Sequence, residues 1–89
     1  MTNIYFIKNA ESNIKIGRAQ NTDRRLKQLQ TANDKNLKII YCIENCENHF
    51  ESHIHEICSV YKISGEWFKK DVIDFLLNIP WYKKHMKQL

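Results

Sequence analysis

Two short β-prone runs near the start of the chain, separated by polar residues, predict two strands. The runs 4–6 and 14–16 are short and β-prone, and polar residues 8–13 lie between them. Two such runs joined by a short polar segment are typical of an antiparallel hairpin. Side chains alternate between the two faces of a strand, so Tyr5 and Lys15 are expected to share one face. The opposite face is expected to carry Ile4, Phe6, Ile14 and Ile16.

The next apolar spacing predicts a helix over 24–32. Asn21 or Thr22 is placed to cap it, because such side chains accept hydrogen bonds from the free N–H groups of a first helical turn. Leu26 and Leu29 mark its buried stripe. The hairpin and this helix together form the N-terminal part of the predicted fold.

Two adjacent arginines in this helix differ in their expected surroundings. Successive residues turn by about 100° around a helix, which places Arg25 beside Leu29 at the edge of the apolar stripe. Arg24 points to solvent instead. We therefore interpret Arg25 as available to a cleft and Arg24 as a surface charge.

The remaining pattern predicts a polar loop over 33–36 and an apolar third strand over 37–43. A helix over 46–61 follows, with Asn45 as its cap, and another helix over 72–77 ends near a proline. Within the longer helix, two polar side chains four residues apart stack on one flank. These are Glu51 and His55.

These elements predict one α/β (α+β) domain over 1–89, with its core at 4–68 and a helical extension at 69–89. The expected order is β-β-α-β-α-α. The sheet is expected to be small, mainly antiparallel and three-stranded, with helices packed against it.

Charge is distributed unevenly along the chain, whose net charge is +4. Residues 1–38 carry eight Lys and Arg against three Asp and Glu, and 69–89 carry five against two. Residues 39–68 carry five acidic residues and one lysine. Basic flanks around an acidic centre suit a polyanion held by the flanks and a cation held by the centre. A solvated surface with uneven charge explains the same numbers.

Three cysteines without a secretory signal favour reduced thiols in a cytosolic setting. We expect the protein in the cytoplasm, or in the nucleus or viral factory of a eukaryotic host, and not among secreted or membrane proteins. A zinc site is an alternative use of the sulfur and imidazole groups, but paired C-x2-C knuckles are absent from the sequence. The residues concerned are Cys42, Cys46, His49, His53, His55 and Cys58.

The hairpin tripeptides Ile4-Tyr5-Phe6 and Lys15-Ile16-Gly17 resemble the signature of the GIY-YIG nuclease superfamily. The likeness is greatest to its compact phage- and virus-type branch, of T5 orf type, which is related to the meiotically up-regulated family. Further along the chain, Arg25 before Leu26 resembles the helix arginine of the family. The pair Glu51-x3-His55 and the segment Gly65-Glu66-Trp67-Phe68 resemble the same branch.

This resemblance implies an endonuclease that hydrolyses DNA phosphodiester bonds with Mg²⁺ or Mn²⁺. A hydrated hard cation needs few protein ligands, and guanidinium groups grip phosphate oxygens in a bidentate way. A cation near the tyrosine is expected to lower its pKa from about 10. The implied roles are catalytic for Tyr5, Lys15, Arg25 and His55, nucleic-acid-binding for Arg18, and metal-binding for Glu51.

Two departures from the family pattern leave alternatives open. Lys15 replaces the second tyrosine, and Leu29 stands where many members have His or Tyr. The same fold could therefore be a catalytically inactive nucleic-acid-binding module, or a small viral interaction or regulatory protein. DNA is the expected partner, and because no further recognition domain is expected, specificity is weak or is supplied by a homodimer or a partner protein.

Overall fold

The N-terminal hairpin forms as the sequence predicts. The computed structural model describes residues 1–32 and 36–89, so most of the predicted loop over 33–36 lies outside the described residues. Strands β1 (Thr2–Lys8) and β2 (Ile14–Ala19) pair antiparallel, with Tyr5 opposite Gly17. The turn between them is held by the Asn9 side chain, whose Oδ1 accepts hydrogen bonds from the backbone N–H groups of Glu11 and Asn13.

The sheet in the described residues has six strands, and the prediction of three is wrong. Their order is β4-β5-β2-β1-β3-β6, and neighbouring strands are antiparallel throughout. Beside the hairpin and β3 (Lys38–Cys46), it contains β4 (Lys62–Ser64), β5 (Trp67–Phe68) and β6 (Lys87–Gln88). The three added strands have two or three residues each, which is too short for alternation to be recognised in a sequence.

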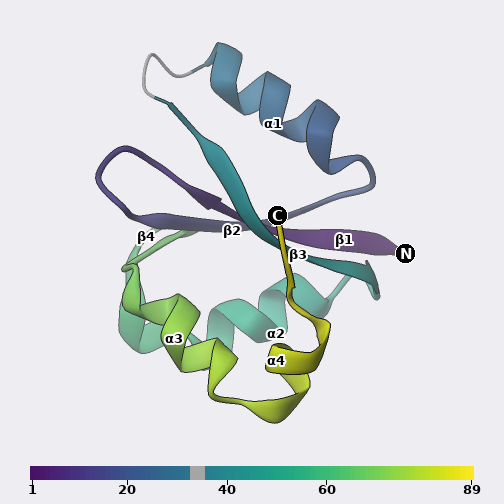
Figure 1. Ribbon diagram of the computed structural model, residues 1–89, viewed down its shortest axis with the longest axis vertical. Helices are drawn as coiled ribbons and strands as arrows, with labels where there is room; N and C mark the ends of the chain where they lie inside the picture. The colour runs from purple at the N-terminus through teal and green to yellow at the C-terminus, as the bar shows by residue number, and fades with distance from the viewer. Residues whose placement is uncertain (33–35) are drawn as a thin grey trace.

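Helices cover both faces of this sheet, as Figure 1 shows. Helix α1 (Thr22–Thr31) lies alone on one face. On the other face lie α2 (Phe50–Ile57), α3 (Asp71–Leu77) and α4 (Pro80–His85), and a 3₁₀ turn (Ser59–Tyr61) follows α2. None of the described helices has the length and apolar character of a membrane span.

The two faces of β1 bury two separate clusters, as strand alternation predicts. Tyr5 and Ile7 pack with Ile39 beneath α1, where Leu26 and Leu29 cover them in part. The opposite face contributes to the larger core, beneath the three other helices. Its fully buried members from β1, β2, α2, β5 and α3 include Ile4, Phe6, Ile16, Ile54, Phe68, Val72 and Leu76.

The start of α2 and the order of the C-terminal elements differ from prediction. β3 continues to Cys46, which pairs with Thr2, so Asn45 lies within the strand with φ 57° and does not cap a helix. His49 occupies the N-cap position, and the helix ends at Ile57. The predicted order β-β-α-β-α-α is wrong because β4, β5 and β6 interrupt and follow the C-terminal helices. By contrast, Asn21 caps α1 as predicted, and its side chain accepts from the Arg24 N–H at 2.9 Å.

We predict that Tyr82→Phe stabilises the fold. Tyr82 is 5% exposed, and its hydroxyl has no hydrogen-bond partner among the described residues. Burial raises the pKa of this hydroxyl to about 12, so the group is neutral, buried and unsatisfied. An unmade buried hydrogen bond costs about 1–3 kcal/mol, and the substitution removes that cost while the ring stays.

Denaturant unfolding of both proteins gives the free energies to compare, with Tyr61→Phe at a half-buried position as the control. A Tyr82→Phe protein less stable than the parent would mean that its hydroxyl has a partner.

Candidate functional site

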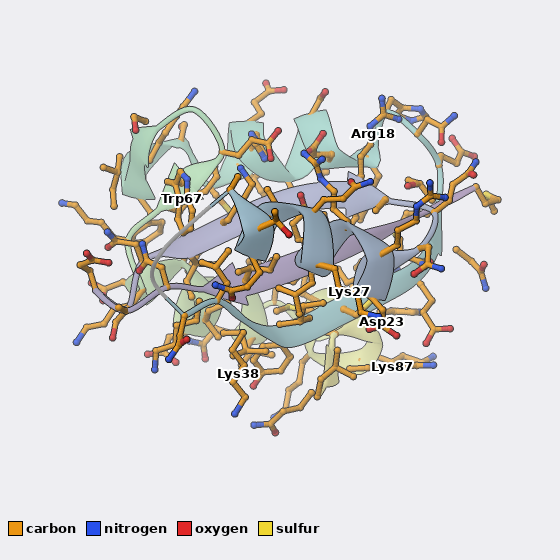
Figure 2. The ribbon with its side chains drawn as sticks, turned by 90° about the horizontal axis from the view of Figure 1, so that it is seen from above. Arg18, Asp23, Lys27, Lys38, Trp67 and Lys87 are labelled. Atoms are coloured by element: carbon orange, nitrogen blue, oxygen red, sulfur yellow. The ribbon has the colours of Figure 1, made fainter. Side chains whose placement is uncertain are left out.

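The predicted site residues meet at the outer edge of β2. Within the described chain, β2 pairs with β5 only through Ile14 and Lys15. Beyond that point α2 lies against the strand, and the His55 Nε2–H donates to the Ile16 carbonyl oxygen at 2.8 Å. Figure 2 shows Arg18 and Trp67 along this edge, with Lys38 and Lys87 along the opposite one. The edge of β2 is therefore bordered by β5 along Ile14 and Lys15 and by α2 beyond them.

Tyr5 lies over the backbone of Gly17, its cross-strand partner. A Cβ atom at position 17 would overlap the Oη and Cζ atoms of Tyr5, so only glycine leaves room for the ring. β2 continues past this glycine to Ala19, and the group that approaches the Gly17 backbone closely is the Tyr5 ring.

Arg25 reaches the tyrosine from α1. It is half-buried and hydrogen-bonds the Tyr5 hydroxyl, whereas Arg24 is exposed. The prediction from helical phase, which separated these two arginines, is confirmed by their burial. Leu29 packs in the small cluster with Tyr5, and it supplies no acid–base group there.

The pKa of Tyr5 is raised, contrary to the expectation of a lowered value. Burial is the largest cause, because the side chain is 1% exposed and the charged form loses its hydration. The Arg25 hydrogen bond acts in the opposite direction, and the negative charges of Glu66 and Glu51 raise the pKa further. At neutral pH the hydroxyl is therefore protonated, with its own proton available for donation.

Glu51 rises from α2 toward the same edge. Its Oε1 lies 3.7 Å from the Arg18 Nε, and an Nη1–H of Arg18 donates to the Asn48 carbonyl at 3.2 Å. The side chain of Glu51 is only 18% exposed. Burial and the charge of Glu66 raise its pKa, while His55, Arg18 and Lys15 act to lower it. The carboxylate thus lies in a partly dry site among charges of both signs.

His55 is fixed by its contacts with the sheet. Because Nε2 donates to the Ile16 carbonyl, that nitrogen carries the proton, and the 3.8 Å to the Glu51 Oε2 is too long for a hydrogen bond. The ring also packs edge-on against Phe68, with centroids 5.0 Å apart. This geometry suits a residue that positions α2 beside β2.

Lys15 is held by the β4–β5 turn, a set of contacts that sequence reasoning left unassigned. Its Nζ lies 3.3 Å from the Glu66 Oε1 and 5.5 Å from the centroid of the Trp67 ring. Glu66 also accepts from the Ile16 N–H through its backbone oxygen. The segment resemblance drew attention to Glu66, but its pairing with Lys15 depends on the two short strands that the sequence did not predict.

The carboxylate of Glu51 is the group of this site that could bind a metal ion. Among the described residues no three His, Cys, Asp or Glu side chains converge, so neither a zinc centre nor a fully protein-ligated cation is supported. A hydrated Mg²⁺ or Mn²⁺ needs only one or two carboxylates. Glu51 fits this requirement, because its raised pKa reflects burial and a neighbouring carboxylate, both of which a cation would offset.

We predict that Glu51→Gln raises stability, and that its benefit grows with pH. The folded pKa of Glu51 lies above its ordinary 4.5, so the folded state binds more protons than the unfolded state between the two values. Parent stability therefore falls as the pH rises from the ordinary to the raised pKa. The glutamine protein has no such fall.

Denaturant unfolding of both proteins across that pH range measures the difference, with Glu56→Gln at an exposed position of the same helix as the control. A benefit that shrinks as the pH rises would show that Glu51 serves mainly as a stabilising ion-pair partner.

One protein-family model matches most of the chain. The model of the T5orf172 domain matches residues 2–81, which include every candidate site residue. Comparison with curated proteins and with solved structures gave no significant match. The match agrees with the T5 orf-type part of the resemblance, and it relates the chain to a nuclease-associated domain family. This chain belongs to the T5orf172 domain family.

Proposed function

We propose that the protein is a divalent-metal-dependent endonuclease of GIY-YIG type that hydrolyses DNA phosphodiester bonds. The observation that carries the proposal is the meeting of Tyr5, Arg25 and Glu51 at one edge of β2. These residues come from β1, α1 and α2, and the two helices lie on opposite faces of the sheet (Figure 1). A structural role for each alone would not require that they share an electrostatic neighbourhood.

The proposed roles follow from the chemistry of each group. Phosphodiester hydrolysis needs charge stabilisation on the phosphate, and Arg25 is suited to grip a phosphate oxygen while it donates to Tyr5. The protonated Tyr5 hydroxyl is suited to donate to an anionic oxygen. Lys15 and the exposed Arg18 add positive charge where a DNA backbone would approach. His55 keeps α2 against β2, and so keeps Glu51 in place.

Glu51 is the proposed ligand for Mg²⁺ or Mn²⁺. When bound, such an ion polarises a phosphoryl oxygen and lowers the pKa of its bound water. A carboxylate is an oxygen ligand, which hard cations prefer, and this one is partly buried.

A nucleic-acid-binding module without catalysis is the second candidate, and two observations favour it. Leu29 lies within the small cluster beneath α1, so it leaves the site without the acid–base group common in the superfamily. The raised pKa of Tyr5 makes this side chain a poor general base. DNA binding that weakens steeply with salt, without cleavage, would favour this candidate over both the nuclease and an interaction protein.

We predict that Arg25→Ala reduces cleavage at least tenfold more than Arg24→Ala. Arg25 is half-buried and hydrogen-bonds the Tyr5 hydroxyl, whereas Arg24 is exposed on the same helix. Loss of one charged donor to a transition state costs about 10²–10³ in rate. Plasmid nicking rates of the two variants test this directly, with circular dichroism to compare their folding. Equal effects of the two substitutions would remove Arg25 from the site.

We predict that Glu51→Ala abolishes cleavage at every Mg²⁺ concentration but preserves or strengthens DNA binding in EDTA. The substitution removes the proposed ligand and a negative charge that faces phosphates. Plasmid nicking and fluorescence anisotropy measure the two effects, and Glu56→Ala on the exposed side of α2 controls for the loss of charge. A Glu51→Ala protein that still cuts in Mg²⁺ would exclude the metal assignment.

A further inference from the structure

A cavity of about 350 Å³ lies between β3, the start of α2 and α4, apart from the candidate site. Its size is that of a small-molecule pocket and is far larger than a single water site. Helices α2 and α4, which contribute to its lining, lie on the same face of the sheet (Figure 1). Its lining includes Glu44, Glu47, His49, Phe50, Trp81 and His85.

Aromatic rings form one wall of this cavity. The imidazole of His85 stacks on the Trp81 indole at 4.2 Å between centroids, and Phe50 meets Trp81 edge-on at 5.3 Å. Despite these contacts, 44% of Trp81 remains exposed. The chain thus presents a large aromatic surface, braced by two other rings, to the cavity and to solvent. Such a surface is suited to stack a planar ring.

Hydrogen-bond acceptors stand beside the aromatic wall. Glu44 and Glu47 bring carboxylates to the lining. The Lys87 Nζ lies 3.0 Å from the Glu44 Oε1, and the His49 Nε2 lies 3.4 Å from the Glu47 Oε2. Both carboxylates can accept hydrogen bonds from a ligand, and Lys87 offsets the charge of Glu44.

The elements at the C-terminal end of the chain, one of which contributes Trp81 and His85 to the lining, carry exposed positive charge. Lys83 and Lys84 are exposed on the last turn of α4, and Lys87 is exposed on β6. An aromatic platform among lysines is the usual arrangement for a nucleotide strand, because the ring stacks on a base and the ammonium groups meet phosphates.

The cavity and the candidate site share one short segment of chain. Glu47, His49 and Phe50 line the cavity, whereas the Asn48 carbonyl accepts from Arg18 and the next helical residue is Glu51. A strand bound at the β2 edge would therefore have this cavity within its neighbourhood.

We propose that this cavity binds an unpaired nucleobase that carries an exocyclic amino group. The base would stack on Trp81, its amino group would donate to Glu44 or Glu47, and its phosphates would meet the lysines. This inference rests on the proposed function, because it takes DNA as the partner. It adds that the substrate has a single-stranded portion, as at a flap, branch or frayed end.

A cationic side chain from a protein partner is the competing occupant, and charge argues against it. Lys87 already pairs with Glu44, and α4 and β6 together carry three exposed lysines against the two carboxylates of the lining. A cationic group would meet net repulsion there, whereas a nucleotide would not.

Single-tryptophan proteins test the proposal, because Trp81 and Trp67 are the two tryptophans of the chain. Trp67→Phe leaves Trp81 as the fluorophore, and Trp81→Phe leaves Trp67. Oligodeoxycytidylate and oligothymidylate of equal length are titrated in EDTA. We expect oligodeoxycytidylate to quench Trp81 and to bind several-fold more tightly than oligothymidylate, whose base has no amino group.

Two further variants separate the base contacts from the fold. Trp81→Ala is expected to weaken single-strand binding about tenfold and to leave duplex binding nearly unchanged. Trp81→Phe keeps an aromatic ring against Phe50 and is expected to fall between the alanine variant and the parent. Glu44→Gln with Glu47→Gln is expected to reduce the preference for oligodeoxycytidylate toward equality.

Each contrary outcome has a distinct meaning. Duplex binding or cleavage with unchanged Trp81 emission would overturn this inference and leave the proposed function intact. Quenching of Trp81 by a lysine-rich peptide and not by either oligonucleotide would assign the cavity to a protein partner and overturn the inference. Failure to bind DNA of any form would overturn both.

Discussion

The Tyr5 ring packs directly over the backbone of Gly17, its cross-strand partner in the first hairpin. This contact fixes the register of the first hairpin, because the ring fits only opposite a residue without a Cβ. A slip by one residue would move Tyr5 into the large core and Phe6 beneath α1. The same contact sets the tyrosine hydroxyl near the β2 edge, within reach of Arg25. Fold and candidate site are thus specified by one cross-strand pair.

Two cationic side chains at this edge of β2 are each paired with a carboxylate. Lys15 is paired with Glu66 and Arg18 with Glu51, at 3.3 and 3.7 Å, and Arg18 is about half exposed. The side chains of Lys15 and Glu51 are only 15% and 18% exposed, so Arg18 is the cation for which a phosphate could most readily replace the carboxylate partner. Helix α1 has no fully buried residue. It covers Tyr5 through the partly buried Leu26 and Leu29, and it places Arg25 beside the Tyr5 hydroxyl.

Local patterns made part of this structure predictable from the sequence. The alternation of side chains along a strand predicts the hairpin and the face that Tyr5 and Lys15 share. Helical phase predicts the different surroundings of Arg24 and Arg25, and side-chain chemistry predicts the Asn21 cap. The short strands β4, β5 and β6 could not be predicted, because two residues give no period and their partners lie far away in sequence. The pairing of Lys15 with Glu66 and of Arg18 with the Asn48 carbonyl depends on the same tertiary contacts.

The direction of the Tyr5 pKa also required the structure. A neighbouring cation such as Lys15 or a metal ion is expected to lower this pKa, but burial beneath α1 outweighs the Arg25 hydrogen bond and raises it. We propose that this edge of β2 cleaves DNA with a divalent ion. The decisive experiment is incubation of the purified wild-type protein with supercoiled plasmid in Mg²⁺, in Mn²⁺ and in EDTA. We expect nicked or linear plasmid with either metal and only supercoiled plasmid in EDTA. Plasmid that is bound but stays supercoiled with both metals would show that this edge does not cleave DNA.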